Sequence, residues 1–364
     1  MVRILHFGLS SSLGGIETYL KKITTHINKD KFQFDFLVMG NEKPCWHDEF
    51  LHMGSRFYKI TKRSKNPLKS NKELKKLFEK EKFDIVHCHL NSLSNISPVL
   101  MALKYNNRVI VHSRNANTPR LHKNKLLHSI NILRLPKRKI VMFAVSDKAG
   151  KWMFGNKSNY TVINNGIDVE DFKYNHQSRI NMRQNLNIED HFSIINVGAL
   201  RYQKNHLFIL EVFKDLLKFK PKSKLLLVGT GHLEQEIRDK AIDLGINEKI
   251  LMLGNRNDIS SLLSASDAFL FPSFYEGFPN ALLEAQTSGL PALYSDTITR
   301  EVIVNYNCQT YSLNKSSKDW AEKLLLLENF DDRKKGAEQV ERNGFSVEEE
   351  IKKLEGLYTN ILNN

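Results

Sequence analysis

The sequence is poor in cysteine and has no long apolar run, and each absence excludes a class of protein. Its three cysteines, Cys45, Cys88 and Cys308, are odd in number and widely spaced, which argues against a disulfide framework and fits a reducing compartment. No run of about 18 apolar residues is present, so we expect no membrane-spanning helix. The opening residues MVRILHFG have a strand pattern and lack the apolar core of a signal peptide. We therefore expect a cytoplasmic protein.

Acidic residues are scarce in the first half of the chain. Residues 1–170 contain 30 Lys and Arg against 13 Asp and Glu, whereas the remaining residues contain 24 against 27. The net charge of +14 therefore lies in the first half, which predicts contact with an anionic surface, either membrane lipid or nucleic acid. A solvated Lys-rich surface would give the same count. Because the chain has no recognisable nucleic-acid-binding module, we expect no nucleic-acid partner.

Length and periodicity predict two α/β domains. A chain of 364 residues suits two domains of about 150 to 200 residues each. Strand patterns alternate with helix patterns, which predicts a parallel sheet in each half. The Asn-Gly turn in VINNGID, residues 162–168, and the polar, unpatterned stretch that follows to about Glu189 place the boundary near residue 170. The expected fold is a pair of Rossmann-like, doubly wound domains at 1–170 and 171–345, with a final helix at 346–364.

Two histidines, His87 and His89, are expected near the end of a strand at Phe83–His87. Because they are two residues apart, they point the same way, toward the edge at which open α/β sheets bind ligands. A zinc site is disfavoured because no third ligand is spaced nearby. Ligand-facing or hydrogen-bonded histidines are the favoured interpretation.

The stretch from Asp267 to Pro291, DAFLFPSFYEGFPNALLEAQTSGLP, has the most specific pattern in the chain. A buried strand pattern precedes Glu276, and a helix pattern begins at Asn280 and carries Glu284 on the same face. Amides at the helix start suit an anion, and the two carboxylates suit vicinal hydroxyls, as in a sugar nucleotide. Alternatively, Glu276 is a solvated loop residue and Glu284 a partner of the helix dipole.

The E-x7-E spacing from Glu276 to Glu284 stands in the wording P-S-x-x-E-G-F-P-N-x-L-L-E-A and is followed by G-L-P. It resembles the donor-site signature of the retaining glycosyltransferases of family four (group 1), of the bacterial capsule and exopolysaccharide-assembly type. The resemblance implies a GT-B fold, with an acceptor domain and a nucleotide-sugar domain facing a central cleft and a last helix crossing back to the first domain. It implies that Glu276 contacts the transferred sugar and Glu284 the ribose hydroxyls. The amides of Gly277, Phe278 and Asn280 would hold the diphosphate.

The resemblance extends to other turns of the second half. The wording G-A-L-R-Y-Q-K-N-H is similar to the family's G-R-L-x-x-x-K, and Lys204 matches the Lys that neutralises the leaving diphosphate. The family's Arg position is Ala199 here, so either Arg201 supplies the second cation, or one cation and the helix terminus suffice. Gly231, in G-T-G-H, matches a turn beside the nucleotide, and Arg256, in G-N-R-N-D, lies at the base-binding loop.

The first half carries weaker wording of the same kind. Gly14 and Gly15, in G-G-I-E-T, are similar to the family loop near the diphosphate and the acceptor. His112, at the tip of the strand RVIVHS, resembles the acceptor-side histidine near the reacting carbon; a buried, hydrogen-bonded histidine is the alternative. The segment Leu121–Lys139 has leucines and isoleucines at helical spacing among Lys, Arg and His. It indicates either a basic interfacial helix or a helix packed on the sheet.

These implications predict a retaining hexosyltransferase that uses a nucleoside-diphosphate sugar, with a UDP-sugar favoured. The acceptor would be a lipid-linked saccharide at the inner face of the membrane, where the basic domain meets anionic lipid during assembly of a cell-surface polysaccharide. Lys204, Arg201 and the helix terminus would stabilise the leaving diphosphate, while Glu276 orients the sugar near His112. No cofactor is expected, and no metal, since no Asp-x-Asp pair is present. A nucleotide-sugar 2-epimerase, which the E-x7-E wording disfavours, and a basic nucleic-acid-binding protein are the alternatives.

Overall fold

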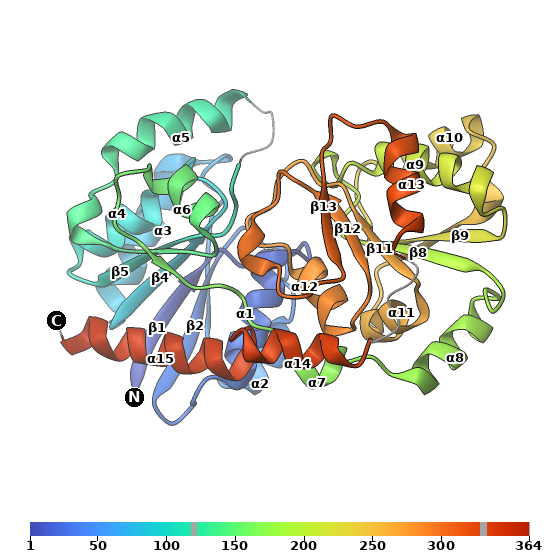
Figure 1. Cartoon of the computed structure of the whole chain (residues 1–364). Coiled ribbons are helices and arrows are strands. Elements are labelled where there is room, and N and C mark those ends of the chain that lie inside the picture. The colour runs from blue at the N-terminus through green and yellow to red at the C-terminus, as the bar shows by residue number, and fades with distance from the viewer. Residues whose placement is uncertain (118–121, 328–332, 364) are drawn as a thin grey trace. The chain divides into compact units, whose positions relative to one another are not determined.

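The computed structural model describes residues 1–117, 122–327 and 333–363, except the side chains of residues 122 and 123. The chain folds into two compact units (Figure 1). Unit 1 consists of Met1–Asn165 together with Val347–Asn364, and unit 2 of Gly166–Ser346. Each unit is built on its own parallel sheet.

The sheet of unit 1 has seven strands in the order β3-β2-β1-β4-β5-β6-β7, all parallel to their neighbours. The strands are β1 (Val2–Phe7), β2 (Phe32–Met39), β3 (Phe57–Ile60), β4 (Ile85–Leu90), β5 (Arg108–Ser113), β6 (Val141–Ala144) and β7 (Thr161–Val162). The helices are α1 (Gly15–His26), α2 (His47–His52), α3 (Pro67–Lys80), α4 (Ser97–Lys104), α5 (His122–Arg134), α6 (Asp147–Phe154) and α15 (Val347–Asn363), with a 3-10 turn η1 (Lys137–Lys139).

Helices cover both faces of this sheet because strand residues alternate between two apolar cores. Ile4 of β1 belongs to a core shared with α1 and α15, whereas its neighbour Leu5 belongs to a second core shared with α3 and α4. Helix α15 lies beside α1 and contributes Leu354 and Tyr358 to the first core (Figure 1). The last helix of the chain therefore completes the first unit, as expected from the sequence.

Unit 2 contains a six-stranded parallel sheet in the order β10-β9-β8-β11-β12-β13. The strands are β8 (Phe192–Val197), β9 (Ser223–Val228), β10 (Ile250–Gly254), β11 (Ala268–Phe271), β12 (Ala292–Ser295) and β13 (Cys308–Tyr311). The helices are α7 (Val169–Phe172), α8 (His176–Asn185), α9 (His206–Phe219), α10 (Glu234–Asp243), α11 (Ile259–Ala265), α12 (Asn280–Thr287), α13 (Ser317–Leu325) and α14 (Lys335–Arg342), with 3-10 turns η2 (Tyr202–Lys204), η3 (Asn247–Lys249) and η4 (Arg300–Val302). In both sheets the order reverses at the first strand of the unit, which is the doubly wound pattern.

The expected fold class, two doubly wound parallel-sheet units, is confirmed. Two local expectations were wrong. The strand expected at Phe83–His87 is β4, Ile85–Leu90, so His87 and His89 lie inside the strand and are buried. The stretch to Glu189, expected to lack structure, contains α8, which buries little apolar surface beyond Met182 and begins at an Asn175 cap. None of the described helices combines the length and the apolar character that a membrane span requires.

Candidate functional site

The loop between β11 and α12 places a nearly buried carboxylate at the carboxyl edge of the unit 2 sheet. Glu276 is 7% exposed. Its Oε2 accepts a hydrogen bond from Gln203 Nε2 at 2.9 Å, and its Oε1 lies 2.9 Å from Lys204 Nζ as an ion pair. Oε1 nevertheless accepts no hydrogen bond from the described residues. This oxygen therefore retains capacity to accept a hydrogen bond from a bound hydroxyl.

The Glu276 loop is joined to the loop that follows β8. Phe274 N donates to Gln203 O at 2.9 Å, and Gln203 Nε2 donates in turn to Tyr275 O at 2.8 Å. Asn205, in the left-handed conformation with φ 58°, donates from its side chain to Pro272 O at 3.2 Å. These bonds bring Lys204 to Glu276, although the two residues are far apart in the sequence.

The Lys204 side chain is held over the first turn of unit 2. A Cβ on Gly198 would lie 2.8 Å from Lys204 Cε, so this glycine leaves the space that the lysine occupies. The ammonium lies 4.5 Å from the centre of the Phe271 ring, a cation–π contact. Burial, and then the Lys204 charge, lower the pKa of His206 to about 3. His206, which the sequence motifs did not single out, is therefore a buried neutral residue beside this cation.

Two more glycines let neighbouring turns approach the β8 loop. A Cβ on Gly231 would lie 2.3 Å from Leu200 O, and one on Gly229 would lie 2.3 Å from Gly198 O. Both clashes would be with backbone atoms, which cannot move as a flexible side chain does. Gly231, singled out in the sequence, therefore lies directly against the loop that carries Lys204.

The first turn of α12 follows Glu276 closely. Gly277 and Phe278 are buried, Pro279 forms the N-cap, and Asn280 is the first helical residue. The N-terminus of a helix carries a partial positive charge, and the proline side chain cannot cap it. Glu284 is half-buried one turn along the helix. The proposed diphosphate-binding backbone is thus next in the chain to the buried carboxylate.

The side chains of two basic residues expected at the site, Arg201 and Arg256, form no ion pair with Glu276. Arg201 is exposed on the β8 loop, and its side chain makes no ion pair with a described residue. Arg256 forms a bidentate pair with Asp258, with Nε to Oδ1 at 2.7 Å and Nη2 to Oδ2 at 2.5 Å. The carboxylate occupies one edge of this guanidinium, so the side chain of Arg256 is tied to its own loop.

In unit 1 the Ser- and Gly-rich loop before α1 is organised by Glu17. Gly14 is the N-cap of α1 and Gly15 its first residue. The buried Glu17 carboxylate accepts hydrogen bonds from Ser10 N at 3.1 Å and Ser10 Oγ at 2.7 Å. A Cβ on Gly14 would lie 3.0 Å from Glu17 Oε2. The sequence pattern pointed to the glycines of G-G-I-E-T and gave no role to Glu17, which ties down the loop.

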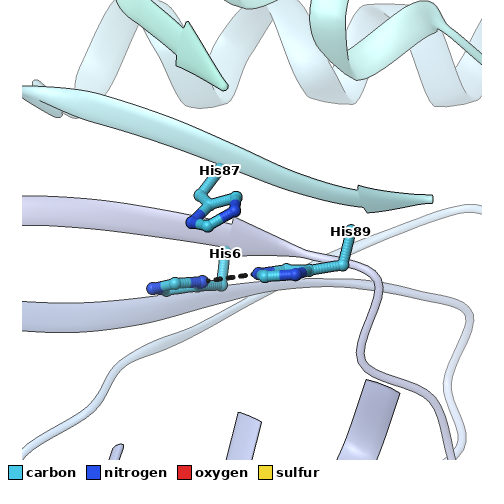
Figure 2. Close-up of side chains that lie close together, drawn as sticks. All are labelled: His6, His87 and His89. Carbon is cyan, nitrogen blue, oxygen red and sulfur yellow. Dashed lines mark hydrogen bonds between the residues drawn. The ribbon is translucent and has the colours of Figure 1, made fainter. Parts of the chain in front are cut away.

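A cluster of buried histidines lies in the sheet of unit 1. Figure 2 shows His6 of β1 beside His87 and His89 of β4, with His6 Nδ1 hydrogen-bonded to His89 Nε2 at 3.0 Å. Each ring offers a nitrogen within 4.8 Å of the others, which is compatible with a metal site. The expectation that no third ligand lies near His87 and His89 was wrong, because parallel pairing of β1 with β4 places His6 opposite His87.

Both nitrogens of His87 are already hydrogen-bonded. Its Nδ1 lies 2.8 Å from Tyr358 Oη and its Nε2 lies 3.2 Å from His112 Nδ1. Metal binding by His87 would displace one of these partners. Burial lowers the pKa values of His87, His89 and His112 well below the usual value and that of His6 to about 3. The rings are therefore neutral at physiological pH, and the hydrogen bonds account for the position of His87.

His112 lies in β5 and is fully buried. Its Nδ1 faces His87, and its Nε2 lies 3.4 Å from Arg114 Nη1. Arg114 is the residue two positions further along the chain, beyond the end of the strand. The structure therefore puts Arg114, which no sequence motif indicated, next to the histidine that the resemblance did indicate.

Comparisons with known proteins cover both units. The model described as Glycosyltransferase Family 4 matches residues 13–171, and that described as Glycosyl transferases group 1 matches residues 178–345. EpsF of Bacillus subtilis, whose name assigns it provisionally to the glycosyltransferases, is 30% identical over 332 residues, covering 88% of this chain and 86% of that protein. The UDP-Gal:alpha-D-GlcNAc-diphosphoundecaprenol alpha-1,3-galactosyltransferase of Escherichia coli is 27% identical over 384 aligned residues, covering 100% of this chain and 98% of that protein.

Among solved structures, Anabaena Alr3699/HepE in complex with UDP-glucose matches with a TM-score of 0.82 at 17% identity. The match covers 99% of this chain and 100% of that one, and at this identity it establishes the fold, which is GT-B. Taken with the two family models and the Bacillus subtilis relative, it leads to one conclusion. The chain belongs to the group 1 glycosyltransferases of family four and has their GT-B fold.

Proposed function

We propose that this glycosyltransferase moves a hexosyl unit, with retention of anomeric configuration, from a UDP-sugar to a lipid-linked saccharide in assembly of a cell-surface polysaccharide. The observation that carries the proposal is the nearly buried Glu276 carboxylate. Its Oε1 faces Lys204 Nζ at 2.9 Å and accepts no hydrogen bond from the described residues. A sugar hydroxyl can donate to this oxygen, in a charge-assisted hydrogen bond stronger than one between neutral groups.

The remaining donor contacts are assigned along the same loop and helix. The backbone amides of Gly277, Phe278 and Asn280 hold the diphosphate at the positive end of α12. Glu284, half-buried one turn later, accepts hydrogen bonds from the ribose hydroxyls. Gly231 lets the nucleotide approach the β9 turn, and Arg256 contributes through its backbone because Asp258 holds its guanidinium.

Charge stabilisation is the proposed source of the rate enhancement. Lys204 stabilises the negative charge that develops on the leaving diphosphate, with Arg201 as a second cation from the same loop. Glu276 orients the sugar and shares the positive charge that develops at its anomeric carbon. The leaving phosphate accepts the proton of the acceptor hydroxyl, so the reaction is proposed to proceed without a metal ion. Activity retained in a chelator such as EDTA supports this part, and loss reversed by a divalent cation refutes it.

Unit 1 is proposed to bind the acceptor, at the loop that carries Gly14 and Gly15. The name of the Escherichia coli relative gives that enzyme UDP-galactose as donor and a diphosphoundecaprenol-linked sugar as acceptor. The Anabaena protein was solved in complex with UDP-glucose. These relatives support a UDP-sugar donor and a lipid-linked acceptor for this chain.

Helix α5 is the proposed membrane contact. Leu126, Ile130 and Leu133 are 63%, 43% and 87% exposed and follow one another at helical spacing on one face. The opposite face packs on the unit, where His128 and Asn131 bond the backbone of Leu93. Exposed basic residues precede and follow this face in the chain: Lys125, Arg134, Arg138 and Lys139. An exposed apolar face with a basic border suits an anionic lipid surface, at the inner face of the cell membrane.

The function is tested by ligand-induced stabilisation followed by turnover. UDP, GDP, ADP and CMP and their common sugars are screened by thermal shift on the wild type and on Glu284→Ala. A nucleotide at a hundred times its dissociation constant stabilises by about 2.7 kcal/mol. We expect a uridine compound to stabilise the wild type and Glu284→Ala to lose most of that effect. Acceptor-independent conversion of the sugar nucleotide would instead indicate a 2-epimerase.

A further inference from the structure

Arg114 is a nine-tenths buried cation of unit 1 that has no carboxylate within ion-pair distance among the described residues. It is 9% exposed. Its Nη2 donates to Asn165 Oδ1 at 3.0 Å, its Nη1 lies 3.4 Å from His112 Nε2, and its guanidinium carbon lies 3.7 Å from the centre of the Tyr19 ring. The described residues thus accept two of the five N–H groups of this guanidinium.

Arg183 of unit 2 has the same exposure, 9%, and very different surroundings. It pairs with Asp267 Oδ2 at 3.1 Å and donates to Ser193 Oγ and to the carbonyl oxygens of Ile188, Glu189, His191 and Ala265. The charge of Arg183 is compensated by the protein itself. Arg114 has no direct ion pair with a described residue, and a buried charge without a close counter-ion is costly to maintain.

The two carboxylates whose charges reach Arg114, Glu17 and Glu350, have other close partners. Glu17 and Glu350 act on Arg114 through space only. The Glu17 carboxylate accepts hydrogen bonds from Ser10, and Glu350 forms an ion pair with Lys22. The neighbouring histidines are neutral, so they add no charge. Neither carboxylate therefore pairs directly with Arg114.

A directed chain of hydrogen bonds holds Arg114 in place. Arginine can only donate, so His112 Nε2 accepts and the proton of the neutral His112 ring is on Nδ1. His112 Nδ1 then donates to His87 Nε2 at 3.2 Å, and His87 Nδ1 donates to Tyr358 Oη at 2.8 Å. The direction of every bond follows from the arginine. Tyr358 of α15 and the two histidines thus act as positioning residues for the guanidinium.

We infer that Arg114 binds an anion in unit 1 and that this anion is the diphosphate of the acceptor. The inference rests on the proposed function, which it deepens by naming the group that recognises the acceptor. Arg114 directly follows β5, at the carboxyl edge where open α/β sheets bind ligands. The N–H groups not accepted by described residues can form the paired hydrogen bonds by which a guanidinium binds phosphate oxygens.

Pyrophosphate binding to the full-length protein in saturating UDP tests this site, because UDP occupies the donor site. Calorimetric titration is expected to give saturable pyrophosphate binding to the wild type. Arg114→Gln should weaken it at least about tenfold, since bonds to charged groups are strong, and should leave the UDP affinity unchanged. Arg63→Gln is the matched control: Arg63 is exposed, also donates to an asparagine side chain, and should bind both ligands normally. Equal pyrophosphate affinity in Arg114→Gln and the wild type would overturn the inference.

Three further measurements keep the test decisive. If Arg114→Gln fails to fold, Arg114→Lys is used instead, because it keeps the charge and loses the paired N–H groups of the guanidinium. This variant should bind pyrophosphate severalfold more weakly than the wild type. Unchanged affinity would overturn the inference. Farnesyl diphosphate in place of pyrophosphate separates a lipid-linked source from a free one, and its binding must also depend on Arg114. An NMR spectrum of the histidine rings should show Nδ1–H tautomers at His112 and His87, and an Nε2–H tautomer at His112 would refute the chain. If UDP did not stabilise the wild type in the thermal-shift screen, that separate result would refute the proposed function.

Discussion

Lys204 and Glu276 form a nearly buried ion pair at the candidate donor site. Nζ and Oε1 lie 2.9 Å apart, and the side chains are only 16% and 8% exposed. Each side chain therefore provides most of the local compensation for the other. A ligand that brings a diphosphate and a sugar hydroxyl to this point would offer a new partner to both groups.

Lys204→Ala is predicted to reduce both stability and activity. It leaves the Glu276 carboxylate buried without its cation, which typically costs about 3 to 5 kcal/mol. It also removes the charge proposed to stabilise the leaving diphosphate, so we expect kcat to fall about a hundredfold to a thousandfold. Urea unfolding and initial rates measure the two effects.

The double variant Lys204→Met, Glu276→Gln separates the two effects. With both charges removed, most of the lost stability should return while the activity stays low. Lys218→Ala is the control, because Lys218 is 66% exposed in its ion pair with Asp215 and should change stability by under about 1 kcal/mol. A fully active double variant would contradict the assigned roles.

Glu284 is predicted to recognise the ribose. The wild type should bind UDP more tightly than 2′,3′-dideoxy-UDP, because the carboxylate accepts hydrogen bonds from the two hydroxyls. In Glu284→Ala the two ligands should bind with similar affinity, since the discriminating group is absent. Calorimetric titration of both ligands into both proteins gives the interaction free energy between Glu284 and the ribose hydroxyls directly. The same preference for UDP in the variant would show that another residue reads the ribose.

Gly231→Ala is predicted to disturb the donor site, since its Cβ would lie 2.3 Å from Leu200 O. Forcing this overlap should cost about 1 to 3 kcal/mol and move the Lys204 loop. Gly356→Ala is the matched control, because the added Cβ in α15 meets nothing within 4 Å and should be neutral or stabilising by up to about 1 kcal/mol. Thermal melting with and without UDP compares them. Equal effects of the two substitutions would mean that the turn tolerates a side chain.

Stability is predicted to fall as the pH falls below the ordinary histidine pKa. Burial lowers the pKa of His206 from 6.5 to about 3, so the unfolded state takes up a proton in this range that the folded state excludes. The loss is about 1.4 kcal/mol per pH unit for each such histidine. His206→Phe should therefore lose about 2 kcal/mol less than the wild type between pH 6.5 and pH 5. Urea unfolding at several pH values measures the slopes, which would be identical if His206 did not contribute.

The exposed face of α5 is predicted to bind anionic membranes. Leu133, 87% exposed, should enter the lipid, so Leu133→Glu should weaken sedimentation with vesicles that contain phosphatidylglycerol. The wild type should bind neutral vesicles less, because the basic border contributes only with anionic lipid. Leu68→Glu is a control, since Leu68 is 82% exposed at the start of α3. If vesicle binding depended neither on lipid charge nor on Leu133, this face would not be the membrane contact.

Apolar periodicity was a good guide to the strands and a poor one to polar helices. Strands β1 (Val2–Phe7) and β11 (Ala268–Phe271) lie where the sequence shows a strand pattern, in MVRILHFG and before Glu276, because each is an apolar run that a turn signal ends. Helix α8 was missed because it buries few apolar residues, although Arg179 on it donates to the carbonyl oxygens of Ser264, Ala265 and Ser266 at the end of α11. Tertiary hydrogen bonds, which no local pattern displays, hold such a helix in place.

The candidate site was predictable as motifs and not as contacts. Glu276 and Lys204 were both named from the sequence, but their ion pair depends on hydrogen bonds between two loops. Arg256 was named for its loop, and its pairing with Asp258 could have been suspected from the spacing of two residues. The environment of Arg114 depends on β-strand pairing and on a tyrosine from the end of the chain, so no spacing rule could have revealed it.

Helix α15 also limits how this protein can be recombined with its relatives. Its residues Val347, Ile351, Leu354 and Tyr358 complete a core whose other buried members come from the first 165 residues, and Tyr358 bonds His87. A chimera made with a single crossover near residue 165 would pack a foreign helix against a native sheet. Exchange of the whole first unit between family members therefore requires two crossovers, so that the helix is inherited together with the sheet that it covers.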